Sequence, residues 1–216
     1  MEDKGGGSLS ANQITGAILA GGLSRRLGRD KASQILAGKP LALWVAEALA
    51  PLVAERWLVT NQPLVHLSLG LSLVTDLRPQ QGPLGGLETA LFYARTPLVL
   101  AAAADAPFLA PGLLAALAGQ AAKGVKTALV CHNAQGLQPF PGIYAVRLLS
   151  RLTKFLNDNG RHARRFLEEC RVQVLFPEEV ARLDPEGRSF LNLNTPEDFA
   201  AAARLAEEIL EINPSS

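Results

Sequence analysis

The sequence has few cysteines and no excess of either charge sign. Only two of its 216 residues are cysteines, Cys131 and Cys170, and neither lies in a CxxC or Cys/His spacing, so we do not expect a zinc site. A single disulfide is one alternative, but two buried free thiols in a reducing compartment are the favoured prediction. The formal net charge is +1, from 21 basic and 20 acidic residues, which argues against a non-specific nucleic-acid binder.

Long hydrophobic runs are also missing. The longest apolar run, from Pro97 to Ala104, is far shorter than the roughly 20 residues that span a bilayer. The first eight residues are polar and glycine-rich and lack the apolar core of a signal peptide. We therefore expect a cytoplasmic protein that binds neither membranes nor nucleic acid.

What the sequence does have is an ordinary globular composition, with 48% hydrophobic and 19% charged residues. A domain of this size buries roughly 70% of its unfolded surface, so it needs neither disulfides nor a structural metal to fold. We expect one domain over residues 13–212, a disordered N-terminal tail at 1–12 and a flexible C-terminus at 213–216.

Short apolar runs alternate with helical patterns along the chain. Strands are predicted at residues 14–20, 56–60, 71–75, 98–103, 127–130, 142–146 and 172–176. Helices are predicted at 41–53, 84–94, 111–122, 147–156 and 163–169, with a last helix from Thr195, where Thr-Pro-Glu-Asp198 is a strong helix start. This alternation predicts an α/β fold whose largely parallel sheet is covered by helices on both faces.

Polar residues or glycines follow four of these apolar runs. They are Gly21, Asn61, Asp76 and Asp105. In parallel α/β sheets, ligands bind beyond the carboxyl ends of the strands. We therefore expect these residues to gather along one edge of the sheet.

The loop between residues 19 and 31 carries the strongest chemical signal. Gly21 and Gly22 allow backbone N–H groups to approach a phosphate closely, because no Cβ stands in the way. Four cations follow within seven residues, beside the single acid Asp30; they are Arg25, Arg26, Arg29 and Lys31. Neither a Walker A loop nor a G-x-G-x-x-G fingerprint matches. The pattern favours a loop that binds a triphosphate. The alternative is a basic loop that only faces solvent.

Asp105 follows an apolar strand and precedes Pro107. A carboxylate in that position is well placed to hold Mg²⁺, a hard ion that takes carboxylate and phosphate oxygens. A turn or cap aspartate is the alternative, since aspartate precedes many turns.

Several weaker candidates have plain structural alternatives. Asn61 and Asn194 could be turn residues, Asp76 could pair with Arg78, and the segment from Gln81 to Gly86 could be a simple loop before a helix. Alternation places the side chains of Asn192 and Asn194 on one side of the chain, where they could act together.

The remaining polar groups give little sign of nucleophilic catalysis. Arg161, Arg164 and Arg165 form a basic patch of a kind that is usually a solvated helix face. No Ser-His-Asp order stands out, and we expect the scattered histidines His66, His132 and His162 to be structural or on the surface.

Four ordered motifs resemble those of the molybdenum cofactor guanylyltransferase family. The pattern L-A-G-G-x-S-x-R-M-G-x-D-K is found at residues 19–31 with Leu27 for methionine, and G-P-L-A-G at 82–86 with Gly85 for alanine. D-x-P is found at 105–107, and N-x-N-T-P-E at 192–197. The chain departs from the family at Gln138, where a histidine is usual, which puts an acceptor contact there in doubt.

The resemblance implies a three-layer Rossmann-like nucleotidyltransferase fold with a mostly parallel, partly mixed sheet. It implies transfer of GMP from GTP, with Mg²⁺, to the terminal phosphate of molybdopterin, and transient contacts with cofactor-biosynthesis or acceptor enzymes. The nucleotide would be held by Leu19, Ala20, Gly21, Gly22, Arg26, Lys31, Asn61, Asp76, Gly82, Pro83 and Leu84. Asp105 would bind the metal and act in catalysis with Arg26 and Lys31, and the acceptor would meet Arg161, Arg164, Asn192 and Asn194.

Three alternative functions stay open on the sequence alone. One is a cytidylyltransferase for the same pterin, or another small-molecule nucleotidyltransferase such as one acting on sugar phosphates. A second is a nucleotide-binding accessory domain without turnover. A third is a protein that only delivers the pterin cofactor.

Overall fold

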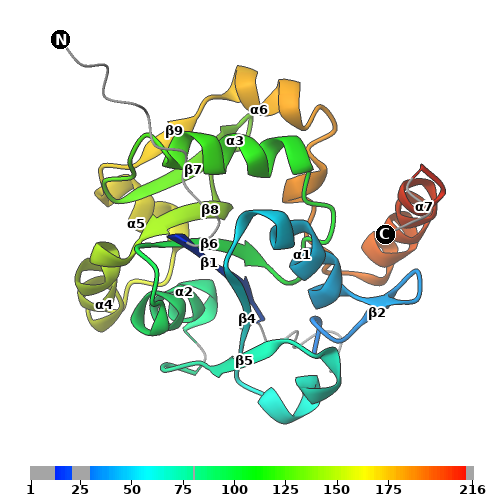
Figure 1. Cartoon of the computed structure of the whole chain (residues 1–216), viewed down its shortest axis with the longest axis horizontal. Coiled ribbons are helices and arrows are strands. Elements are labelled where there is room, and N and C mark those ends of the chain that lie inside the picture. Colours follow the sequence, from blue (N-terminus) through cyan, green and yellow to red (C-terminus); the bar gives the residue numbers. More distant parts are fainter. Residues whose placement is uncertain (1–12, 21–29, 80, 213–216) are drawn as a thin grey trace.

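A seven-stranded mixed sheet forms the centre of the protein (Figure 1). The structure, a computed structural model, describes residues 13–20, 30–79 and 81–212. The strands are β1 (Ile14–Leu19), β4 (Glu55–Thr60), β5 (Ser72–Thr75), β6 (Leu98–Ala103), β7 (Ala128–Asn133), β8 (Gly136–Ala145) and β9 (Gln173–Leu175). Their order is β5-β4-β1-β6-β8-β7-β9, and β8 alone among these strands runs antiparallel to its neighbours. The predicted α/β class with a mostly parallel, partly mixed sheet is confirmed.

Helices cover both faces of this sheet. They are α1 (Leu41–Leu49), α2 (Gly82–Tyr93), α3 (Pro111–Ala121), α4 (Leu149–Asn157), α5 (Ala163–Glu169), α6 (Pro177–Leu183) and α7 (Pro196–Ile212). The apolar core over one face takes its side chains from α1, α3 and α6, and the core over the other from α2, α4 and α5. In Figure 1, α3 and α6 lie on one side of β1 and β6, and α2 and α4 on the other. All six residues of β1 are buried, as expected for a parallel strand covered on both faces.

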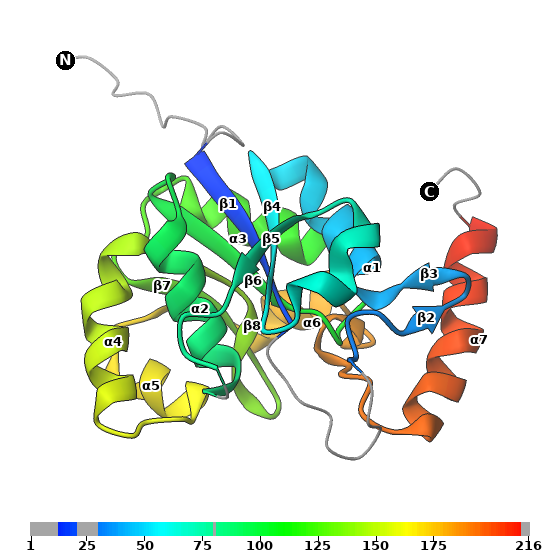
Figure 2. The same cartoon turned by 90° about the horizontal axis from the view of Figure 1, so that it is seen from below.

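A third apolar cluster joins α7 to the rest of the molecule. A short hairpin of β2 (Ile35–Leu36) and β3 (Lys39–Pro40) lies beside α7 (Figure 2). Leu36, Trp44 and Phe108 pack there with Leu193, which immediately precedes Asn194, and with the inner face of α7. This cluster fixes the segment that leads into the last helix.

The carboxyl ends of four parallel strands lie level with one another. Leu19 pairs with Val59 on one side and Ala103 on the other, and Thr60 pairs with Thr75. The residues that follow these strands therefore share one edge of the sheet. The expected gathering is confirmed for Asn61, Asp76 and Asp105, while Gly21 lies outside the described residues.

Some predicted boundaries were wrong. The predicted helix over 41–53 ends at Leu49, and a 3₁₀ turn follows at Ala50–Leu52, because Pro51 has no N–H for the helix ladder. The predicted strand at 142–146 begins at Gly136, because β8 continues through two prolines. The hairpin of β2 and β3, the 3₁₀ segment η3 (Pro63–Leu69) and α6 were not predicted.

Two further predictions concern the thiols and the membrane. Cys131 and Cys170 are both free and buried, as predicted. Within the described ranges, no helix combines the length and the apolar character that crossing a membrane requires.

Candidate functional site

Lys31 brings together three of the sequence motifs. Its ammonium donates hydrogen bonds to Asp105 Oδ2 at 3.0 Å and to Asn194 Oδ1 at 2.5 Å. The side chains of Lys31 and Asp105 are 16% and 24% exposed, so the ion pair is partly shielded from water. A cation, a carboxylate and an amide oxygen thus meet at the carboxyl edge of the sheet.

Asp105 is held by backbone bonds to two separate elements. Before it, the N–H of Ala104 donates to the carbonyl of Leu19 at 3.1 Å, which ties the end of β6 to the end of β1. Its own carbonyl accepts the N–H of Leu193 at 2.8 Å. These bonds fix the carboxylate relative to both the first motif and the last.

Asn194 is positioned by the start of α7. The N–H groups of Asn194 and Thr195 donate to Asp198 Oδ2 at 2.8 and 2.9 Å, and Asp198 N–H donates to Thr195 Oγ1 at 3.2 Å. The first two of these bonds hold the pKa of the Asp198 carboxyl below its ordinary value. The predicted helix start at Thr195 is confirmed.

Alternation along the segment before α7 is as expected. Leu193 is fully buried, and Asn192 and Asn194 on either side of it are exposed. The amide of Asn194 also donates to the carbonyl of Asn192 at 3.2 Å. The two asparagines therefore present one polar surface beside Asp105.

The oxygens around Lys31 Nζ are of the kind that binds Mg²⁺. Asp105 Oδ2 and Asn194 Oδ1 converge on one cation, and both are hard oxygen donors. Among the described residues, no three His, Cys, Asp or Glu side chains gather into a cluster that could hold a metal. Mg²⁺ commonly takes one or two carboxylates together with substrate phosphates and waters. The donor set therefore fits a metal ion that binds together with a polyphosphate.

Asp76 is buried, and one of its carboxylate oxygens is hydrogen-bonded within the protein. The residue is 5% exposed, and Oδ1 accepts hydrogen bonds from Arg78 N–H at 3.1 Å and Thr89 Oγ1 at 2.9 Å. Burial raises the pKa of this carboxyl above its ordinary value. The guanidinium of Arg78 points elsewhere, pairing with Glu88 Oε2 at 2.7 Å and donating to Asn157 at 2.6 Å. Asn61, by contrast, is exposed directly after β4.

The helix predicted from Leu84, after a turn at residues 81–83, begins two residues earlier, at Gly82, so Gly82 and Pro83 belong to the first turn of α2. Gly82 begins the helix with a φ of +66°, a conformation that favours glycine. Leu84 is buried in the core, so only its backbone can face a ligand. A Cβ at Gly86 would lie 3.3 Å from Leu19 Cδ2, so the absence of a side chain lets α2 pack closely against β1. The start of α2 and the end of β1 are thereby neighbours.

The glycine and arginine part of the first motif cannot be placed. Gly21, Gly22 and Arg26 lie outside the described residues. At the described end of that motif, Leu19 is buried, and Ala20 is half-buried and donates its N–H to the carbonyl of Val59 at 2.9 Å.

The structure does not bring all the predicted acceptor residues together. Arg161 and Arg164 are exposed at the start of α5. Figures 1 and 2 show α5 and α7 at opposite ends of the long axis, so the arginines are remote from the helix that follows Asn194. Gln138, at the family's histidine position, is 9% exposed and donates its amide to Asn133 Oδ1 at 2.9 Å in the β7–β8 hairpin.

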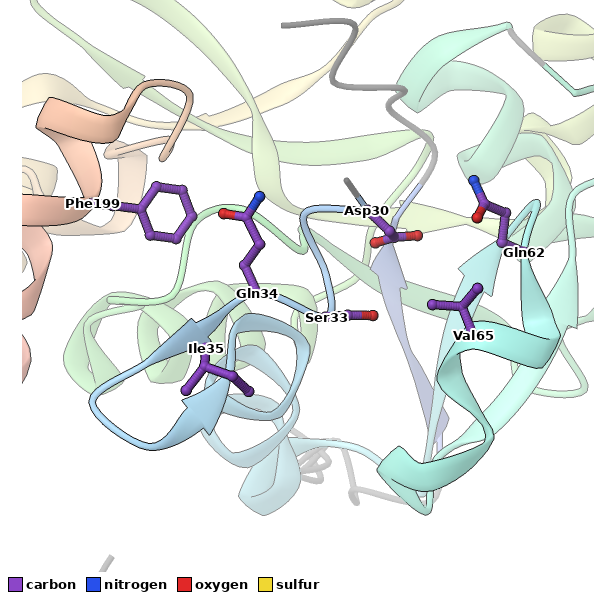
Figure 3. A pocket seen from close by; sticks show the side chains of 7 residues that line it. All are labelled: Asp30, Ser33, Gln34, Ile35, Gln62, Val65 and Phe199. Carbon is purple, nitrogen blue, oxygen red and sulfur yellow. The ribbon is translucent and has the colours of Figure 1, made fainter. Parts of the chain in front are cut away.

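A pocket of about 740 Å³ opens beside Asp30 (Figure 3). It is lined by Asp30, Ser33, Gln34, Ile35, Gln62, Val65 and Phe199, so it lies between the chain after Lys31, the segment after β4 and α7. Sequence reasoning missed this pocket, because its walls come from three distant parts of the chain.

Sequence reasoning also missed the contacts of His66. The ring is fully buried, with Nε2 at 2.9 Å from Asp30 Oδ2 and Nδ1 at 3.1 Å from Ser33 Oγ. The expectation that His66 is structural or on the surface did not anticipate that its two partners flank Lys31. Since the histidine lies more than thirty residues away in sequence, no local spacing pointed to it.

Comparison with known proteins gives consistent results. The family model of the MobA-like NTP transferase domain matches residues 16–174. A "probable molybdenum cofactor guanylyltransferase" of Deinococcus radiodurans is 33% identical over 92% of this chain and 98% of that protein. A "molybdenum cofactor guanylyltransferase" of Cereibacter sphaeroides is 37% identical over 89% of this chain and 97% of that protein.

Solved structures agree with these sequence matches. The "molybdopterin-guanine dinucleotide biosynthesis protein A" from Archaeoglobus fulgidus is 28% identical, with a TM-score of 0.76 over 90% of this chain and 99% of that one. A 4-diphosphocytidyl-2C-methyl-D-erythritol synthase from Anaerococcus prevotii is 13% identical with a TM-score of 0.67 over 91% of this chain and 97% of that one, which shows a shared fold alone.

Proposed function

The chain belongs to the MobA-like NTP transferase family, and from that premise we propose that it is a molybdenum cofactor guanylyltransferase. It transfers GMP from GTP to the terminal phosphate of molybdopterin or its molybdenum-loaded form and releases pyrophosphate. The observation that carries the proposal is the meeting of Lys31, Asp105 and Asn194 at the carboxyl edge of the sheet.

The chemistry requires no general base. An oxygen of the acceptor's phosphate monoester attacks the α-phosphorus of GTP, the bond from that phosphorus to the β-phosphate oxygen breaks, and pyrophosphate leaves with the electron pair. The monoester is already an anion at pH 7, so no proton has to be removed. Positioning and charge neutralisation are the main tasks of the protein in such a transfer.

Lys31 and Asp105 carry these tasks in our proposal. Lys31 places its ammonium against the triphosphate, together with Arg26. Asp105 and the amide oxygen of Asn194 would hold Mg²⁺ when GTP binds. A metal ion held there would supply neutralisation of charge on the phosphates. The hydrogen bonds of Asp198 keep the segment at Asn194 in place.

The nucleoside and the acceptor occupy the same edge of the sheet in this proposal. The backbone from Leu19 to Gly22 and the first turn of α2, from Gly82 to Leu84, shape the nucleotide pocket, with Asn61 and Asp76 at the nucleoside. Asn192 and Asn194 lie toward the acceptor. Arg161 and Arg164, exposed at the start of α5 and remote from α7, are left out of this acceptor site. The substrates in this proposal are GTP and the pterin cofactor, and the protein partners are the enzymes that supply or receive the cofactor.

A pyrophosphate-release assay with molybdopterin, Mg²⁺ and each nucleoside triphosphate in turn tests this proposal. We expect release with GTP and little with CTP, UTP or ATP. Asp105→Ala should lower the rate by roughly a hundredfold or more while the circular dichroism spectrum is unchanged, because the metal contributes several kcal/mol to stabilising the transition state. Asp158→Ala, at an exposed acid that ends α4, is the matched control and should retain full activity.

Other results would favour another function. Preferential use of CTP would identify a cytidylyltransferase. GTP binding without pyrophosphate release, in the presence of the acceptor, would indicate an accessory domain, and pterin binding without any nucleotide dependence would indicate a delivery protein. Undiminished turnover in Asp105→Ala would refute the metal role of that residue.

A further inference from the structure

His66 links two residues on either side of Lys31. It lies on η3 between β4 and β5, and its ring is fully buried. Nε2 contacts Asp30, directly before Lys31, and Nδ1 contacts Ser33, two residues after it. We propose that His66 is a positioning residue that fixes the 30–33 turn and, through it, the ammonium of Lys31. This inference rests on the role given to Lys31 in the proposed function.

The turn around Lys31 is closed by its own hydrogen bonds. Asp30 Oδ1 accepts the N–H of Ala32 at 2.8 Å, and Gln34 N–H donates to the carbonyl of Lys31 at 3.0 Å. Since an ionised carboxylate only accepts, the contact at Asp30 Oδ2 uses the N–H of His66 Nε2. Both oxygens of Asp30 are thereby engaged, one inside the turn and one by the histidine.

The turn is then fixed from two sides. The N–H of Ala42, in α1, donates to the carbonyl of Ala32 at 3.0 Å, and His66, in η3, contacts Asp30 and Ser33. A lysine side chain has a flexible four-carbon stem, so it holds a defined position only if its backbone and its ammonium are both fixed. Asp105 and Asn194 fix the ammonium, and His66 with Ala42 fixes the backbone.

If His66 only filled space, a substitution of similar volume would have no effect on Lys31. A phenylalanine would fill nearly the same volume, so His66→Phe would then leave Lys31 unchanged. In our proposal the two ring nitrogens matter, because their loss frees both Asp30 and Ser33. The reactivity of the Lys31 amine distinguishes the two roles, since an amine held in two hydrogen bonds is protected from acylating reagents.

The experiment measures acetylation of Lys31 by an N-hydroxysuccinimide ester in the full chain without substrates, followed by peptide mass spectrometry. In His66→Phe we expect Lys31 to react roughly tenfold faster, and turnover with GTP and molybdopterin to fall by roughly tenfold, the usual size of an effect exerted through a supporting residue. His132→Phe, the same change on β7, is the control and should alter neither. In a Lys31→Met background, His66→Phe should reduce turnover by less than about twofold, because coupled residues are not additive.

The outcomes separate this inference from the proposed function. Acetylation needs no substrate, so the acetylation rate of Lys31 still tests the positioning role of His66 if the parent chain releases no pyrophosphate. An unchanged acetylation rate in folded His66→Phe, or an equal loss of turnover in the Lys31→Met background, would overturn the inference. If His66→Phe does not fold, Ser33→Ala removes one of the two bonds and leaves the ring intact. It should raise the acetylation rate of Lys31 roughly threefold, and no rise would overturn the proposal.

Discussion

Two opposing influences act on the pKa of the Asp76 carboxyl. Burial favours its neutral form, and nearby Glu88 adds to this, whereas the hydrogen bonds from Arg78 N–H and Thr89 Oγ1 favour the charged form. Burial is the largest of these influences, so the pKa of Asp76 is raised. An acid with a raised pKa in the folded state makes folding less favourable once it ionises.

Asp76→Asn should therefore change how stability depends on pH. The contribution of Asp76 is fully present below its ordinary pKa of 3.8 and is lost as the pH rises through the raised pKa of the folded state. The amide keeps an acceptor for both hydrogen bonds and never ionises. Urea unfolding across this window should show the variant gaining stability relative to the parent as the pH rises. A difference between Asp76→Asn and the parent that stays constant with pH would contradict the prediction.

Single residues of the site differed in how well the sequence predicted them. Lys31, Asp105 and Asn194 were predicted because each belongs to a short motif with a recognisable order. The sheet brings the ends of β1 and β6 together, and the backbone bond from Leu193 N–H to the Asp105 carbonyl brings Asn194 to the same place. His66 belongs to no motif, and its role depends on a turn and a 3₁₀ segment whose packing no periodicity reveals. Local sequence thus pointed to the three residues that the structure brings together, but not to the histidine that contacts the turn beside them.

The first turn of α2 explains a departure from the family pattern. Where the family has alanine, this chain has Gly85, and a Cβ there would lie 2.9 Å from Gln81 Cβ and 3.2 Å from the carbonyl of Arg78. The carboxylate of Asp76 is the next nearest group, at 3.6 Å. A Cβ at this position would therefore force its neighbours at Gln81 and Arg78 to shift.

Gly85→Ala should therefore destabilise the protein by about 1–3 kcal/mol, although alanine is normally the better helix former. Gln81→Gly removes the closest contact and is well tolerated before a helix, so the same alanine should cost less than half as much in that background. Gly119→Ala on α3, where a new Cβ meets nothing within 4 Å, is the control and should stabilise by about 0.5–1 kcal/mol. Denaturant unfolding measures all four variants. A stabilising Gly85→Ala would show that the turn relaxes freely.

Among whole elements, the buried ones were predicted best. The apolar run of β6, which is buried along nearly its whole length, matches the structure at both ends, since burial produces a clear hydrophobic pattern. The start of β8 was missed because Pro139 and Pro141 are typical of a turn. The hairpin of β2 and β3 consists of two-residue strands, and such short pairings are set by contacts with α7 rather than by sequence pattern.

At the scale of the whole molecule, the fold keeps its two thiols apart. Cys131 lies in β7 between β8 and β9, where burial raises its pKa to about 12. Cys170 lies at the end of α5, and burial raises its pKa as well. Exposing Cys131 requires α3 and α6 to lift from the core that they share with β7, whereas exposing Cys170 requires only the end of a short surface helix to open.

The labelling rates of the two thiols should therefore report two different motions, opening of the core around Cys131 and opening of the end of α5 at Cys170. With a disulfide reagent at pH 8, Cys170 should react first, and Cys131 should react at a rate that follows global unfolding, at least roughly a thousandfold slower than in concentrated urea. Low urea should strongly accelerate the labelling of Cys131 and weakly accelerate that of Cys170. The reason is that the opening that exposes Cys131 also exposes the whole core, whereas the opening at Cys170 is local. Cys170→Ser isolates the slow reaction, and Cys131→Ala isolates the fast one. Equal rates in dilute buffer would mean that the helices covering β7 open without global unfolding, so that this outer part of the core is a unit less stable than the edge that carries Lys31 and Asp105.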